Sequence, residues 1–164
     1  MERAQDVLKT YANNMCCTAC YTFVGLCCWD NFNQFPPKQR ENEIIYHSFL
    51  SWENGQGVGE DGSVNDPVRL LESVSDRVGW RVEKKKVAGI MDTEGKLCLA
   101  RFVKDDKQHF VVVYDYKMVY NPVSYSRCVA EGEIKDIRLI WTPDVLCVPL
   151  VQDGVGCNAT VHYK

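Results

Sequence analysis

The chain has 164 residues, of which 46% are hydrophobic and 25% charged, and this composition predicts one globular domain over 1–164. Its 19 basic and 22 acidic residues give a net charge of −3, which argues against a nucleic-acid partner. No apolar run approaches the roughly 18–20 residues that cross a bilayer, and the polar opening at 1–6 has no signal-peptide core. We therefore expect a cytoplasmic protein without a membrane partner.

Cysteine is the unusual feature of the composition, because there are nine and five of them crowd near the N-terminus. An odd number in a chain without an export signal is not typical of a secreted disulfide framework, so we expect reduced thiols. Cys17 and Cys20 have the C-x-x-C spacing of a zinc knuckle, but no second such pair occurs. We expect no metal and no cofactor, and interpret most of these thiols as small buried side chains. The five crowded cysteines are Cys16, Cys17, Cys20, Cys27 and Cys28.

The first half of the chain predicts helices. Weak helical periodicity at 4–10 is interrupted at 11–14, where two asparagines favour turns and helix N-caps. The next segment, 15–29, carries almost no charge and predicts a helix that is buried on most sides.

Proline and glycine divide the rest of this half into loops and helices. Pro36 and Pro37 indicate a loop, whereas Asp66 and Pro67 are typical of a helix N-cap and first turn. The glycine-rich stretch between these two sites lacks the Gly-Lys-Ser/Thr ending of a phosphate loop, so we interpret it as an ordered connection. The expected segments are a loop at 30–40, a helix at 41–52 that stops at Gly55, a loop at 55–67 and a helix at 68–78.

Beyond Trp80 the pattern changes to short alternating segments rich in Val, Ile and aromatic residues, which predict an antiparallel sheet. Glu94 and Gly95 indicate a hairpin turn. Helices followed by strands predict an α+β fold with one helix against a face of the sheet. The expected strands are 81–90, 97–103, 110–115, 118–120, 137–141 and 145–151.

A cysteine at the start of the buried helix is the candidate nucleophile. Cys16 has this position, and we expect the unpaired N–H groups of a helix N-terminus to lower its pKa. A thiol nucleophile needs a base, for which imidazole is the usual group. His47 falls in a helical pattern and His162 near the C-terminus, whereas His109 stands at the mouth of a predicted strand that should run through the centre of the sheet.

A third polar residue is expected beside His109. Asn121 closes the strand that follows, and a turn at 115–117 would bring the ends of the two antiparallel strands together. His109 and Asn121 are therefore predicted to be neighbours across a hairpin.

The order of these three residues resembles that of papain-like cysteine peptidases. More closely, 109–113 (His-Phe-Val-Val-Val), 120–122 (Tyr-Asn-Pro) and 124–141 resemble the bacteriocin-leader-processing, or double-glycine, peptidase-like group, and in particular its small phage- and plasmid-borne relatives. The glycine-rich stretch within 51–71 also resembles the segment that those relatives place before a helix.

The resemblance implies a papain-like α+β fold, with the nucleophile at the start of a buried helix, and a thiol hydrolase that cleaves a peptide or isopeptide amide of a peptide or protein substrate. It implies that Cys16 is the nucleophile, His109 the base and Asn121 the residue that orients the imidazole. Cys17 is the alternative nucleophile, because a shift of one residue would put it in the same role. We favour Cys16, since the helical pattern then places Cys20 one turn further on, against the core.

Two departures from the family pattern leave alternatives open. Thr10 stands where such enzymes usually place an oxyanion-binding Gln, and the amide of Asn13 or Asn14, with the Cys16 N–H, is the substitute that we consider. Asn121 stands where relatives often have Asp.

The first alternative function is a catalytically idle papain-like protein, phage-borne, that binds or inhibits a host factor. The second is a cysteine-rich zinc-binding module.

Overall fold

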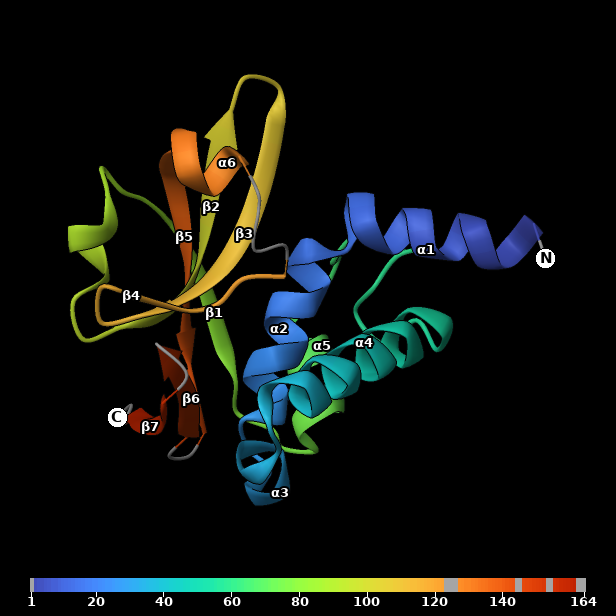
Figure 1. The fold of residues 1–164 in the computed structure, drawn as a ribbon, viewed down its shortest axis with the longest axis horizontal. Coiled ribbons are helices and arrows are strands. Elements are labelled where there is room, and N and C mark those ends of the chain that lie inside the picture. The colour runs from blue at the N-terminus through green and yellow to red at the C-terminus, as the bar shows by residue number, and fades with distance from the viewer. Residues whose placement is uncertain (1, 123–126, 144–145, 153–154, 162–164) are drawn as a thin grey trace.

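Helices occupy the N-terminal half of the chain and strands most of the other half in the computed structural model, which describes residues 2–122, 127–143, 146–152 and 155–161 (Figure 1). The predicted α+β class is confirmed. The helices are α1 (Glu2–Asn14), α2 (Cys16–Leu26), α3 (Asp30–Gln34), α4 (Pro37–Glu53), α5 (Pro67–Ser75) and α6 (Arg127–Glu131), with a 3-10 turn η1 (Ile90–Thr93). The strands are β1 (Arg81–Lys86), β2 (Leu97–Lys104), β3 (Lys107–Tyr114), β4 (Lys117–Tyr120), β5 (Glu133–Trp141), β6 (Leu146–Gln152) and β7 (Val155–Val161). None of the helices in the described ranges is both long enough and apolar enough to span a bilayer.

The main sheet has five antiparallel strands in the order β1-β5-β2-β3-β4. The predicted hairpin at Glu94 and Gly95 is wrong, because β1 pairs with the distant β5 and a 3-10 turn separates it from β2. β2 is the central strand, and β3 lies next to it rather than at the centre. A separate hairpin, β6–β7, includes the C-terminal strand.

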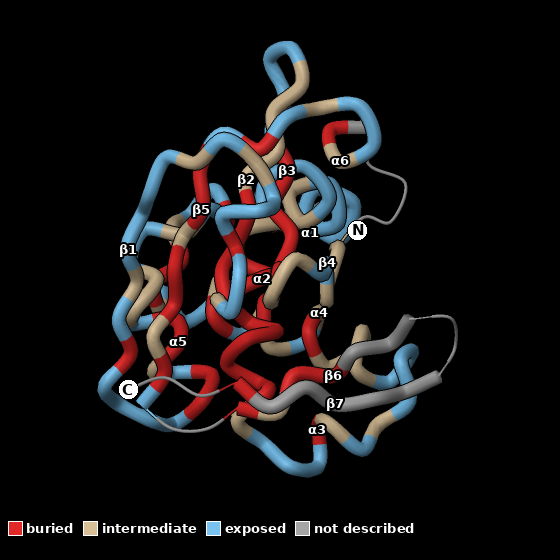
Figure 2. Tube along the Cα trace, turned by 90° about the vertical axis from the view of Figure 1, so that its left-hand side faces the viewer, coloured by how far each residue is buried: buried red, intermediate tan, exposed pale blue. Residues whose placement is uncertain are grey.

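The predicted buried helix, α2, packs between β3 on one side and α4 and α5 on the other (Figure 1). Figure 2 shows the buried residues concentrated in α2 and the inner strands, whereas α1 and β1 are largely exposed. Side chains alternate along β3 as the pleat requires: Phe110 and Val112 belong to the cluster around α2, and Val111 and Val113 to the cluster on the other face. The strand next to α2 is therefore buried on both faces.

Two expected interruptions of the helices are shorter than predicted. α1 continues through the asparagines to Asn14, and the break is the single residue Met15, whose side chain is fully buried. The expected loop at 30–40 instead holds α3 and the first turn of α4. Pro37 is the first residue of α4, where a missing N–H costs no hydrogen bond, so the proline starts a helix instead of excluding one.

The predicted cap of α5 is confirmed, because the Asp66 carboxylate accepts a hydrogen bond of 3.1 Å from the backbone N–H of Arg69. The helix ends three residues earlier than expected, since Asp76 adopts a left-handed conformation (φ 57°). Before the cap, the glycine-rich connection is closed by a bridge between Val58 and Val64. This connection is ordered and returns to the start of α2.

Candidate functional site

The start of α2 is held in place by the glycine-rich connection. The Thr18 hydroxyl donates a hydrogen bond to the Gly62 carbonyl (2.8 Å), and the Asn14 side-chain amide donates one to the Asp61 carbonyl (3.0 Å). Gly62 has φ +87°, and a Cβ there would lie 2.7 Å from the Cγ of the buried Met15. Only glycine fits this contact, which fixes the backbone immediately before Cys16.

Two sulfur atoms of α2 contact the backbone of one residue in β3. The Cys20 thiol donates a hydrogen bond to the Phe110 carbonyl oxygen at 3.4 Å. One turn earlier, the backbone of the same Phe110 is hydrogen-bonded to the Cys16 sulfur. This bond favours the thiolate, so the Phe110 N–H group is the donor. Cys20 is fully buried against the core, as expected, and Cys16 lies against the residue that follows His109.

His109 and Asn121 are neighbours across the β3–β4 hairpin, as the sequence predicts. The Nε2 atom of His109 lies 2.7 Å from the Oδ1 atom of Asn121. An amide oxygen only accepts hydrogen bonds, so Nε2 carries the proton and the lone pair of the neutral ring is on Nδ1. His109 is buried, being 6% exposed, and its orientation is fixed by this bond.

Burial favours the neutral form of both the thiol and the imidazole. It raises the pKa of Cys16, and the opposing hydrogen bonds from the backbone of Phe110, Cys17 and Cys16 itself do not reverse the shift. It also lowers the pKa of His109, against the smaller opposite effect of the Asn121 bond. The expected lowering of the Cys16 pKa is therefore wrong, because partial burial at the start of α2 leaves a thiolate poorly solvated. Both shifts favour an uncharged side chain at neutral pH, a thiol at Cys16 and an imidazole at His109.

Cys17, the alternative nucleophile, lies in a different environment. Burial raises its pKa to about 12, the Cys16 sulfur adds to the rise, and the Arg138 charge opposes it. The Arg138 guanidinium lies over the ring of Phe110, 4.8 Å from its centroid, and is paired with Asp136. Cys17 thus lies near the charged side chain of Arg138 on β5.

The two asparagines considered as oxyanion donors differ in their contacts. The Asn14 amide is engaged with Asp61, and Asn13 is exposed on α1. Met15, the N-cap of α2, provides no side-chain hydrogen bond to the first turn. Backbone N–H groups of Cys16 and Cys17 are directed at the Cys16 sulfur. Main-chain N–H groups are therefore the hydrogen-bond donors that this point offers to an oxyanion.

Sequence reasoning missed two contributions to this site. The Phe110 backbone leaves no residue-type signal, because any residue has an N–H and a carbonyl. The second is Cys128, which lies in α6, is 7% exposed, and adds to the raised pKa of Cys16.

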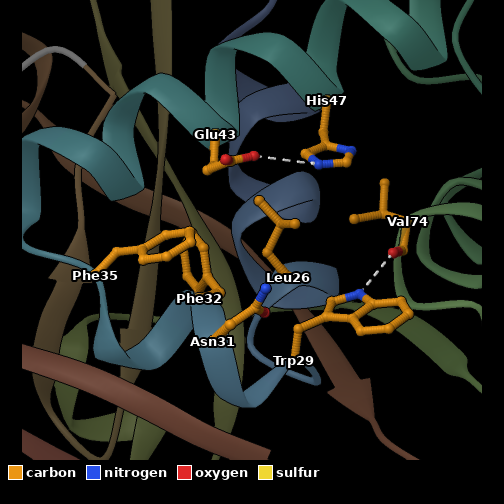
Figure 3. Close-up of a pocket in the computed structure, with 8 residues that line it drawn as sticks. All are labelled: Leu26, Trp29, Asn31, Phe32, Phe35, Glu43, His47 and Val74. Carbon is orange, nitrogen blue, oxygen red and sulfur yellow. Dashed lines mark hydrogen bonds and ion pairs between the residues drawn. The ribbon is translucent and has the colours of Figure 1, made fainter.

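The other histidine that the structure describes is His47, and its Nε2 atom lies 3.4 Å from the Glu43 carboxylate on α4. Figure 3 shows both residues at a cavity of about 180 Å³, where the Trp29 indole donates a hydrogen bond to the Val74 carbonyl. Leu26, the last residue of α2, lines this cavity. The cavity therefore lies at the opposite end of the helix from Cys16. His162 lies outside the described residues.

Eight of the cysteines, those whose side chains the structure describes, form no disulfide. Within the same segments, no three His, Cys, Asp or Glu side chains are grouped so that they could hold a metal ion. Comparisons with protein-family models, with curated proteins and with solved structures find no match to this chain.

Proposed function

We propose that the protein is a papain-like thiol hydrolase that cleaves an amide bond of a peptide or protein. Cys16 is the nucleophile, His109 the general base and acid, and Asn121 the residue that orients the imidazole. The observation that supports this best is the 2.7 Å bond between His109 Nε2 and Asn121 Oδ1, next to the residue whose backbone holds the Cys16 sulfur. His109 and Asn121 are joined across the β3–β4 hairpin, and Cys16 reaches the same hairpin from α2.

The proposed reaction starts from the neutral pair. As the Cys16 sulfur bonds to the substrate carbonyl carbon, Nδ1 of His109 takes the thiol proton, and backbone N–H groups at the start of α2 stabilise the oxyanion. The imidazolium then gives its proton to the leaving amine while the C–N bond breaks, which leaves a thioester on Cys16. Water, deprotonated by His109, attacks this thioester and releases the carboxylic acid and the free thiol.

A catalytically idle binding protein is the second candidate, and two observations favour it. The Asn14 amide is engaged with Asp61, and burial holds both Cys16 and His109 in their neutral forms. A protein of this kind would keep the arrangement of side chains without turnover.

Peptidyl vinyl sulfones and a peptide library decide between the two functions. We expect the probe to modify Cys16 covalently, as located by mass spectrometry, and we expect hydrolysis that Cys16→Ala abolishes. Cys17→Ala is the matched control and should keep both reactions. Failure of the probe to modify Cys16, together with no hydrolysis that depends on Cys16, would leave the idle protein as the function.

A further inference from the structure

A second cavity adjoins the proposed catalytic site. Its volume is about 200 Å³, and it lies between α2, α4, β4 and β6. Asn121 is shared by the cavity and the proposed catalytic site, since it lines the cavity and is hydrogen-bonded to His109. Most of the remaining wall is apolar: Phe23, Pro37, Ile44, Val119 and Pro149.

The Glu41 carboxylate is the acidic group among the residues that line this cavity, and no cationic side chain in the described ranges forms an ion pair with it. Its partner is the Tyr120 hydroxyl, which donates a long hydrogen bond of 3.5 Å. Among the ion pairs of the described residues, none involves Glu41. Burial raises the pKa of this carboxyl group, as expected for a charge that is partly removed from water. An uncompensated carboxylate beside an apolar cavity is costly unless a cation reaches it.

Arg40 also lines the cavity, but its guanidinium is directed elsewhere. It donates a hydrogen bond to the Phe35 carbonyl at the α3–α4 junction. The neighbouring arginine therefore does not neutralise Glu41.

The Tyr11 hydroxyl is a buried polar group near Glu41. Among the described residues it finds no hydrogen-bond partner. Burial raises the pKa of Tyr11, and the Glu41 charge raises it further, which places the two groups in the same neighbourhood. A cation that entered beside Glu41 would reduce the electrostatic cost of burying these groups.

We propose that this cavity is the specificity subsite for a lysine side chain of the peptide substrate, close to the scissile bond, with the Glu41 carboxylate as its counter-ion. The apolar wall suits the aliphatic stem of lysine, and the carboxylate suits the ammonium group at its tip. The inference rests on the proposed function, because it names the substrate class of the same site.

The test begins with a degenerate peptide library, incubated with the full chain and with Cys16→Ala, and the cleavage products are sequenced by mass spectrometry. We expect lysine to be enriched next to the cleaved bond. The best peptide is then made with lysine, norleucine or glutamate at that position. The kcat/KM for lysine should exceed that for norleucine by about 10- to 100-fold, the range for one hydrogen bond to a charged group.

Two substitutions on α4 separate recognition from stability. Glu41→Gln should bring the lysine-to-norleucine ratio close to one, and Glu41→Lys should make glutamate the preferred residue. Glu43→Gln is the matched control, because it is the same chemical change on the same helix, at the cavity of His47, and should leave the ratio unchanged.

The outcomes are distinguishable. Cleavage that depends on Cys16 but shows no preference for lysine would overturn the subsite and leave the hydrolase function in place. No cleavage that depends on Cys16 would overturn both. If the Glu41 variants fail to fold, the lysine-to-norleucine ratio of the unaltered chain decides the matter alone.

Discussion

The Cys20 thiol donates a hydrogen bond to the Phe110 carbonyl, and this bond sets the position of α2 along β3. Because Cys16 is one helical turn earlier, its sulfur lies against the N–H of the same residue. His109 precedes Phe110 and is held by Asn121 from β4. One backbone residue thus connects the helix that carries the thiol with the hairpin that carries the imidazole.

Replacing Cys20 should therefore cost more than the loss of a small buried side chain. We expect Cys20→Ala to lower the free energy of unfolding by about 1–3 kcal/mol, the cost of leaving a buried acceptor unsatisfied. Urea denaturation measures this loss. Cys98→Ala is the control for lost volume, since Cys98 is also fully buried, on the other face of the sheet. Equal losses for the two variants would show that the hydrogen bond contributes nothing.

Removing the imidazole should have a larger effect on hydrolysis than removing its partner. We expect His109→Ala to lower kcat by about 10²–10⁴-fold, the usual contribution of a general acid and base. Asn121→Ala should have a smaller effect, and Asn121→Asp should retain most activity because its carboxylate still accepts the Nε2 proton. Steady-state kinetics of the three variants would contradict the assignment if Asn121→Asp were as slow as His109→Ala.

The acid limb of the pH–rate profile should lie below the ordinary histidine pKa of 6.5, because burial lowers the pKa of His109. The neutral imidazole is the active form, so activity should persist as the pH falls past 6.5 and disappear only at the lowered value. Asn121→Ala removes the bond that raises this pKa and should shift the limb further toward acid. A limb above 6.5 in the kcat/KM profile would contradict the lowered pKa of His109.

The cap of α5 gives a stability test that is independent of catalysis. Asp66→Ala removes the acceptor for the Arg69 N–H and should lower the free energy of unfolding by about 0.5–2 kcal/mol. Asp66→Asn keeps a side-chain oxygen at the N-cap and should be close to neutral. Thermal or urea unfolding that ranks the asparagine variant with the alanine variant would contradict the role of this cap.

Local signals in the sequence were sufficient where neighbours in the chain decide the structure. Asp66 predicted the N-cap of α5 because capping involves residues within one turn. The short turn between β3 and β4 was enough to predict that His109 and Asn121 meet. The class of the fold followed from the change of period near Trp80.

Features that depend on distant contacts could not be predicted in the same way. Glu94 and Gly95 look like a hairpin turn, yet β1 pairs with β5, about fifty residues later, and no local pattern specifies that partner. The raised pKa of Cys16 follows from burial by other elements, whereas the sequence showed only a helix N-terminus. Glu41 resembled an ordinary residue of an amphipathic helix, and only the folded chain places it at a cavity.

β4 pairs with only the last three residues of β3, so the outer side of β3 continues past the end of its neighbouring strand. At Phe110 two sulfur atoms, instead of another strand, satisfy the main-chain groups on that side. The sheet is thus terminated here by a helix, which protects it from adding the strand of another chain. Losing both thiols at once would leave the Phe110 N–H and carbonyl without these partners, although α2 would still cover this edge.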